Sequence, residues 1–167
     1  IAAVSQIEMT SAPSGSLSGH KITLTLGSVP VVTEIAATGG TNIEVKNLFY
    51  NIPARRKFLK SNSYESGLIS ELLTKYALGH PKIRFRLINN RKVVFDTANM
   101  KTTEERLSYF YGADIVPMII NVPKTQFAPA RFLEMSLIRK DISRNNRAQE
   151  LFFVNGRLIK SQALSSA

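Results

Sequence analysis

Residues 40–60 read GTNIEVKNLFYNIPARRKFLK, and the hydropathy pattern of this stretch changes sharply at its proline. Ile43 and Val45 alternate with polar residues, which is typical of a half-buried strand. Proline pushes the residue before it into an extended conformation, so the strand region ends near Ile52. Pro53 suits the first position of a helix, where its missing N–H costs nothing. We therefore predict a strand followed by a short helix that begins at Pro53.

This short helix carries four cations within six residues, namely Arg55, Arg56, Lys57 and Lys60. The positive end of a helix dipole disfavours cations near the helix start unless an anion compensates them. The cluster therefore indicates either a bound anion or an internal ion pair. Pairing of Arg55 or Arg56 with a carboxylate inside the protein stays open beside anion binding.

Upstream of this stretch, alternating residues at 21–26 predict a strand, and Pro30 begins a second at 31–35. Gly39 and Gly40 break the chain before the third. Downstream, residues 63–78 have the four-residue periodicity of an amphipathic helix, with Gly79 and Pro81 as stop signals. We expect its apolar stripe to be buried core; the stripe comprises Tyr64, Leu68, Ile69, Leu72, Leu73, Tyr76 and Ala77.

The rest of the chain alternates between antiparallel-looking strands and short helices. A hairpin over 82–95 turns at Asn89-Asn90, and the polar residues 97–101 are a candidate domain boundary. A capping box at 102–105 begins a helix that Gly112 ends. Strands are expected at 115–122, 130–138 and 150–154, with a basic loop at 139–147 and a last helix near Ser161. This mixture predicts the α+β class, with domains 1–98 and 99–167.

A second cationic segment reads FFVNGRLIK over residues 152–160. Its strand ends in an Asn155-Gly156 turn that presents Arg157 and Lys160. A turn of this kind suits contact with an anion, although an ordinary turn with a solvated arginine fits the sequence as well.

Composition narrows the classes of protein. The sequence contains 22 Lys and Arg residues and 12 Asp and Glu residues, which gives a net charge of +10. This charge suggests a polyanionic partner such as nucleic acid. With no cysteine and two histidines, His20 and His80, disulfides and thiolate metal sites are excluded and a zinc site is not expected. Walker, G-x-G-x-x-G, H-E-x-x-H and G-x-S-x-G motifs are all missing, so no catalytic residue or metal ligand is predicted. No apolar run is long enough to suggest a membrane span, and an intracellular compartment is expected.

The string GTNIEVKNLFYNIPARRKFLKS, followed about a hundred residues later by FFVNGRLIKS, resembles the MutL family of DNA mismatch-repair proteins. The opening IAAVSQIEMTS resembles the strand that precedes the first string in that family. The resemblance implies the back part of a GHKL ATPase sandwich in residues 1–98. It implies the front part of a ribosomal-protein-like transducer domain in 99–167. Both ends of the chain look cut, so a fragment of a longer protein is expected.

Gly40 and Thr41 match the last ATPase motif of the family, whose threonine helps to bind the adenine end of the nucleotide. The family's magnesium-and-water helix, its D-x-G-x-G adenine site, its glycine-rich lid and its transducer lysine do not occur in these residues. The resemblance therefore implies ATP and Mg²⁺ as cofactors of the longer protein. Neither is expected to be bound by the fragment, which should not hydrolyse ATP alone.

In the MutL family, basic residues at the two quoted strings line a groove that holds DNA. The matching residues here are Arg157 first, then Arg56 and Lys57, and then Arg55, Lys60 and Lys160. The implied partners are DNA, bound weakly through phosphates, a MutS-type mismatch recogniser, and a second copy in an ATP-driven dimer. No membrane partner is expected, and the implied location is the cytoplasm and nucleoid, or the nucleus in a eukaryote.

Two alternatives stay open at the level of sequence. A stand-alone RNA-binding module would suit the positive charge, but such modules expose aromatic residues among their cations. Most aromatic residues here lie at apolar-face positions, with Tyr50 and Phe58 as the exceptions. A related GHKL protein such as a gyrase or chaperone would share the architecture, and the NLFYNIPARRKFL string argues against it.

Overall fold

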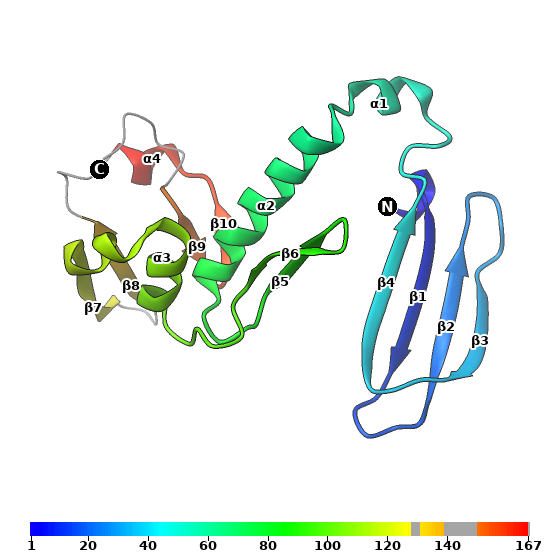
Figure 1. Cartoon of the computed structure of the whole chain (residues 1–167), viewed down its shortest axis with the longest axis horizontal. Coiled ribbons are helices and arrows are strands. Elements are labelled where there is room, and N and C mark those ends of the chain that lie inside the picture. The colour runs from blue at the N-terminus through cyan, green and yellow to red at the C-terminus, as the bar shows by residue number, and fades with distance from the viewer. Residues whose placement is uncertain (128–130, 139–149, 167) are drawn as a thin grey trace. The chain divides into compact units, whose positions relative to one another are not determined.

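The computed structural model describes residues 1–127, 131–138 and 150–166 (Figure 1). The chain divides into two compact units, Ile1–Asn62 and Ser63–Ala167. Both units combine helices with antiparallel strands, which confirms the predicted α+β class.

The first unit is built on a four-stranded antiparallel sheet with the order β3-β2-β1-β4. A 3-10 turn, η1 (Ala2–Val4), leads into β1 (Gln6–Ala12), β2 (Ser18–Leu24), β3 (Val31–Ala36) and β4 (Gly40–Lys46). The three strands predicted from alternation are thus present, with their ends shifted by a few residues. β4 starts at Gly40, whose φ of 126° is a conformation that side-chain-bearing residues rarely adopt.

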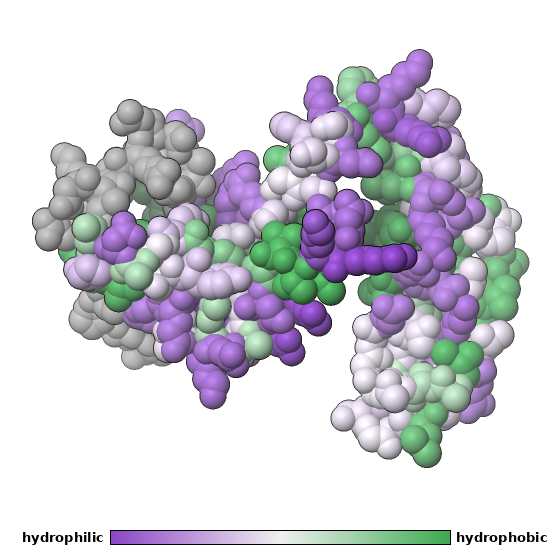
Figure 2. Space-filling view, in the orientation of Figure 1, coloured by the Kyte–Doolittle hydropathy of each residue, from purple (hydrophilic) through white to green (hydrophobic). Residues whose placement is uncertain are grey.

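One face of this sheet is apolar. The register aligns Ile43 with Met9, Met9 with Ile22, and Ile22 with Val32, so aliphatic side chains cross all four strands. Ile43 and Val32 remain 60% and 58% exposed. Figure 2 shows apolar atoms at the surface over β3.

Helix α1 (Pro53–Phe58) follows β4 through a tight turn, which confirms the predicted helix start at Pro53. Asn47 and Phe49 adopt positive φ values of 54° and 60° in this turn. The Phe49 N–H donates to the Val4 carbonyl at 2.6 Å, which fixes the turn against the N-terminal segment.

Among the residues that the structure describes, the second unit has a long helix, two shorter helices and three two-stranded ribbons. Its elements are α2 (Asn62–Gly79), β5 (Arg86–Asn89), β6 (Lys92–Asp96), α3 (Thr103–Tyr111), η2 (Ala113–Met118), β7 (Ile119–Phe127), β8 (Arg131–Ile138), β9 (Phe152–Val154), β10 (Arg157–Ile159) and α4 (Gln162–Ser165). The ribbons pair β5 with β6, β7 with β8, and β9 with β10.

The structure confirms most of the capping and turn motifs that the sequence predicts in the second unit. Thr102 and Glu105 form the expected capping box, and α3 ends before Gly112. The β5–β6 turn falls one residue later than predicted, because Asn90 and Arg91 take the positive φ values. The strand predicted from 115 begins only at Ile119, since the preceding residues form η2. The predicted basic loop at 139–147 lies outside the described residues.

The prediction of a buried stripe along all of α2 is wrong for the N-terminal part of the helix. Tyr64, Leu68, Ile69 and Leu72 are 47–56% exposed, whereas Ala77 is fully buried. Burial is confined to the end of the helix because residues of α3 and β9 contact α2 there. Periodicity identifies an apolar face correctly but cannot show what covers it.

The polar segment 97–101 is anchored rather than a free linker. Thr97 is only 1% exposed, and its hydroxyl accepts the Phe85 N–H at 2.9 Å. The Met100 carbonyl accepts two hydrogen bonds from the guanidinium of Arg106. The compact units divide after Asn62 instead. The domain boundary between 98 and 99 stays a prediction.

Candidate functional site

Thr41, the candidate adenine-site residue, lies near the start of β4 on the apolar side of the sheet. It shares a face with Ile43, two residues further along the strand. Its hydroxyl is 2.8 Å from that of Ser11, its direct partner on β1. The neighbouring Gly39 approaches Ser14 so closely that a Cβ would come within 2.8 Å of the Ser14 Cα. The arrangement offers a fixed hydroxyl at the edge of an apolar surface, beside a closely packed glycine turn.

The α1 cations lie at the other end of the same strand. β4 has seven residues, which corresponds to about 20 Å at a rise of about 3.3 Å per residue. Figure 1 shows β4 running from the Gly40 end to the turn that leads into α1. Thr41 and the α1 cations are therefore two separate candidate sites in the first unit.

The α1 cations lie at the end of the helix rather than at its start, and no internal ion pair holds Arg55, Arg56 or Lys57 among the described residues. α1 has six residues, so Arg55, Arg56 and Lys57 occupy its last turn, where the dipole favours cations. The helix dipole therefore gives no reason to expect a compensating anion, and anion binding by these cations stays a prediction. All three side chains are exposed, and none forms an ion pair or hydrogen bond with any residue that the structure describes. Lys60 follows the helix and does have an interaction of its own.

In the second unit, the predicted turn at Asn155-Gly156 joins β9 to β10. Both residues have positive φ, 51° and 74°, which is the backbone signature of a tight two-residue hairpin. Arg157 follows the turn directly, is exposed, and has no ionic partner in the described part of the chain. The structure thus presents this guanidinium at the tip of a ribbon.

Lys160 follows the same ribbon but has a carboxylate nearby. The Lys75 ammonium, 2.5 Å from Glu71 in α2, lowers the pKa of that carboxyl, and the charge of Lys160 lowers it further. Glu71 pairs directly with Lys75, and no ion pair joins Lys160 to a carboxylate of the described residues.

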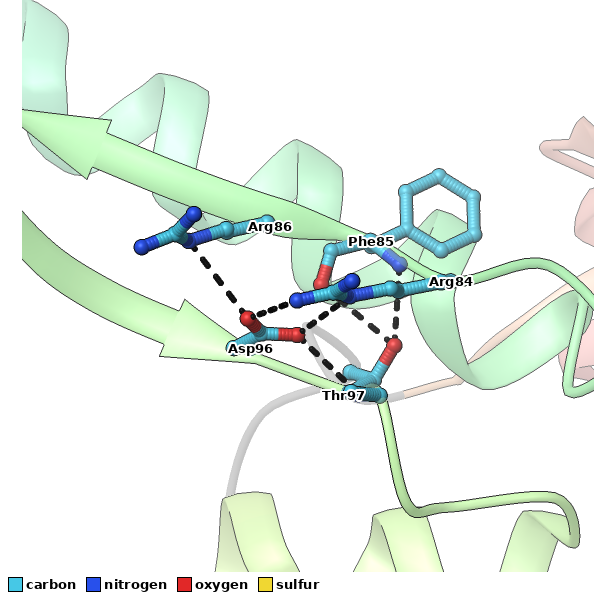
Figure 3. A network of polar contacts seen from close by, with 6 residues as sticks. Arg84, Phe85, Arg86, Asp96 and Thr97 are labelled. Atoms are coloured by element: carbon cyan, nitrogen blue, oxygen red, sulfur yellow. Dashed lines mark hydrogen bonds and ion pairs between the residues drawn. The ribbon is translucent and has the colours of Figure 1, made fainter.

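Two other cations of the second unit are tied into the base of the β5–β6 hairpin (Figure 3). Arg84 donates two hydrogen bonds to the carboxylate of Asp96, at 2.9 and 2.7 Å, and Arg86 lies 3.4 Å from the same carboxylate. The Arg84 hydrogen bonds are the main reason that the pKa of Asp96 is lowered. These arginines share one carboxylate at the base of the hairpin, so their charge is partly compensated.

Sequence reasoning missed Arg106, which is 1% exposed. Its guanidinium donates six hydrogen bonds to five backbone carbonyls, those of Ala77, His80, Pro81, Ile83 and Met100. Burial lowers its pKa, and Glu105 partly opposes that shift. It fastens the end of α2 and the following loop to α3. No local pattern indicates this role, because the acceptors lie more than twenty residues upstream, except for Met100.

Within the described ranges, no three His, Asp or Glu side chains gather where they could hold a metal ion. In the same ranges, no helix is both long and apolar enough to cross a bilayer.

Comparison with solved structures identifies the fold. The Aquifex aeolicus MutL ATPase domain complexed with ADP matches 99% of this chain and 63% of its own, with a TM-score of 0.72 and 24% identity. The N-terminal domain of a DNA repair protein matches 99% of this chain with a TM-score of 0.80 and 16% identity. The chain therefore has the mixed α+β fold of MutL ATPase-domain structures.

Curated relatives match over the whole chain. The DNA mismatch repair protein MutL of Thermoanaerobacter pseudethanolicus is 32% identical over 169 residues, and that of Clostridium beijerinckii is 35% identical over 167. The chain belongs to the MutL family and matches the region of its N-terminal ATPase domain. It spans about a quarter of the length of these relatives, 27% and 25%. No family model matches the chain.

Proposed function

We propose that this chain supplies the phosphate-gripping surface of a MutL-type mismatch-repair ATPase and one wall of its adenine site. The observation that carries the proposal is the exposed Arg157 at the tip of the β9–β10 ribbon, which has no ionic partner among the described residues. The cations of α1, which have no partner within the described ranges, support it. Contact should be to phosphate, because neither segment presents an element that could read base edges.

For the whole protein, we propose slow ATP hydrolysis with Mg²⁺. ATP would drive dimerisation around DNA, and a MutS-type protein would be the partner that reports the mismatch. Residues 1–98 would be the back of the GHKL ATPase sandwich, and 99–167 the front of the transducer domain. Thr41 would donate or accept one hydrogen bond at the adenine end, while Ile43 on the same face would contact the base.

In the mechanism we propose, the chain binds and orients but performs no chemical step. ATP hydrolysis needs a carboxylate base, magnesium and phosphate-gripping amides. The sequence contains none of the motifs that supply them. The chain alone should therefore not turn over ATP.

DNA binding by the 167-residue chain tests the proposal, measured by fluorescence anisotropy on duplexes of unrelated sequence across a range of salt concentrations. Binding should be weak, insensitive to sequence and steeply salt-dependent. Arg157→Glu should lower affinity and reduce the log–log salt slope by about 0.9 for each phosphate that the variant no longer binds. The control is Lys92→Glu, an equal charge change at an exposed residue of β6.

The two variants together separate a phosphate contact from a general charge effect. If Arg157→Glu and Lys92→Glu lower affinity equally, the ribbon has no special part in binding. If Arg157→Glu leaves affinity and slope unchanged, Arg157 is a solvated turn residue and the proposal is wrong.

A further inference from the structure

The ribbon that carries Arg157 is too small to hold its own shape. β9 and β10 have three residues each, and they pair only with each other among the strands that the structure describes. An isolated two-stranded hairpin is at best marginally stable in water. A fixed position for Arg157 therefore requires a surface against which the ribbon packs.

That surface is the C-terminal end of α2. The ring of Phe153, in β9, lies directly on Gly79, so that a Cβ at this glycine would overlap a ring atom. The same ring meets His80 edge-on at 5.9 Å, and His80 stacks on Tyr76 at 6.1 Å. On the other side of the turn, Gly156 approaches His80, and a Cβ there would lie 3.0 Å from its Cε1.

The backbone of this surface is itself fixed. Arg106 donates hydrogen bonds to the carbonyls of Ala77 and His80, on either side of Gly79. The line of contact thus runs from a buried guanidinium through the end of α2 to the turn before Arg157.

We propose that Gly79 and His80 are positioning residues for the DNA contact of Arg157. The missing side chain at Gly79 admits Phe153, and the His80 ring supports both β9 and the turn. This inference rests on the proposed phosphate contact of Arg157, and it adds that the contact depends on two residues that do not touch DNA.

The test is Gly79→Ala, with Gly67→Ala as its control. Both glycines lie in α2, but a Cβ at Gly67 meets nothing within 4 Å. On duplex DNA, Gly79→Ala should lower affinity and reduce the salt slope by about 0.9, as Arg157→Ala does, while Gly67→Ala binds like the unchanged chain. Combining Gly79→Ala with Arg157→Ala should give no further loss, since both remove one contact.

Two further variants guard against a folding defect. Phe153→Leu added to Gly79→Ala frees space at the clash and should recover part of the lost affinity. His80→Ala leaves the backbone of the surface in place and should reproduce the reduced slope. Urea unfolding identifies any variant that does not fold. If Gly79→Ala does not fold, the DNA affinity of His80→Ala tests the positioning role instead.

The outcomes separate this inference from the function on which it rests. Loss of affinity in Arg157→Ala, with none in Gly79→Ala or His80→Ala, overturns the positioning role and leaves the DNA contact standing. The positioning role is also overturned if Gly79→Ala lowers DNA affinity as much in the Arg157→Ala background as it does alone. The effect of Gly79 would then not depend on Arg157. No change in any variant, Arg157→Ala included, overturns the DNA contact itself.

Discussion

Replacing Arg106 with alanine should destabilise the second unit more than any surface change. The guanidinium is 1% exposed and makes six hydrogen bonds to five carbonyls. A hydrogen bond to a charged group contributes about 1.5–3 kcal/mol, so a simple sum over six bonds would approach the whole stability of a domain. The buried charge has also lost its hydration, which costs several kcal/mol.

The net effect follows from what the substitution leaves behind. Arg106→Ala leaves a cavity and takes a donor from five carbonyls, of which that of His80 keeps the Ile83 N–H. Each buried acceptor left unsatisfied costs about 1–3 kcal/mol. Arg106→Lys should lie between Ala and the unchanged chain, because an ammonium has three donors and cannot reach five acceptors.

Urea unfolding followed by far-UV circular dichroism measures the loss of unfolding free energy, since α2 and α3 contain most of the helical residues that the structure describes. Lys82→Ala is the control, because this exposed residue lies between two of the accepting carbonyls and should change stability by less than about 0.5 kcal/mol. An Arg106→Ala chain that unfolds within about 1 kcal/mol of the unchanged chain would refute the reasoning. Solvent would then be satisfying the carbonyls as well as the guanidinium does.

Leu72, Asp96 and Thr41 each allow a further test. Leu72→Ala should cost well below the roughly 2–5 kcal/mol of a core leucine, because Leu72 is 49% exposed; a full core-sized loss in urea unfolding would show that its face is covered in solution. Asp96→Asn should weaken the acid dependence of the unfolding free energy. Because the folded-state pKa of Asp96 is lowered, its ionised carboxylate stabilises the fold above about pH 4, and this stabilisation is lost as pH falls through the folded pKa. An unchanged dependence of stability on pH would count against the Arg84 pair. In a full-length MutL protein carrying this segment, Thr41→Ala should weaken nucleotide binding by about 1 kcal/mol while Thr41→Ser retains it; equal affinities by calorimetry would remove Thr41 from the adenine site.

The parts of this fold that could be predicted are those that depend only on residues adjacent in the sequence. The Thr102–Glu105 capping box, the Asn155-Gly156 turn and the helix start at Pro53 each depend on a few adjacent side chains, and each is present. Their energetics are local, so they can be predicted without knowledge of the tertiary arrangement.

The parts that could not be predicted depend on distant partners. Periodicity in α2 identifies an apolar face, but only packing decides that Ala77 is buried while Leu72 is not. Arg106 could not be recognised because its acceptors are backbone carbonyls, which every residue has. The dipole argument for α1 does not apply because it depends on the length of the helix, and Leu59, where α1 ends, carries no strong stop signal.

The distribution of ion pairs is what separates a nucleic-acid surface from an ordinary basic one. A net charge of +10 is compatible with either. In the described residues, the carboxylates of Glu8, Glu44, Glu71 and Asp96 pair with lysines or arginines of the sheet, α2 and the β5–β6 hairpin. In those same residues, the cations of α1 and Arg157 have no such partner, and both groups are exposed beside turns with defined backbone conformations. Cations without a carboxylate partner keep their full charge for phosphate, whereas paired cations are already partly compensated. The arrangement of charge among the described residues therefore supports the phosphate contact proposed above more than the net charge alone does.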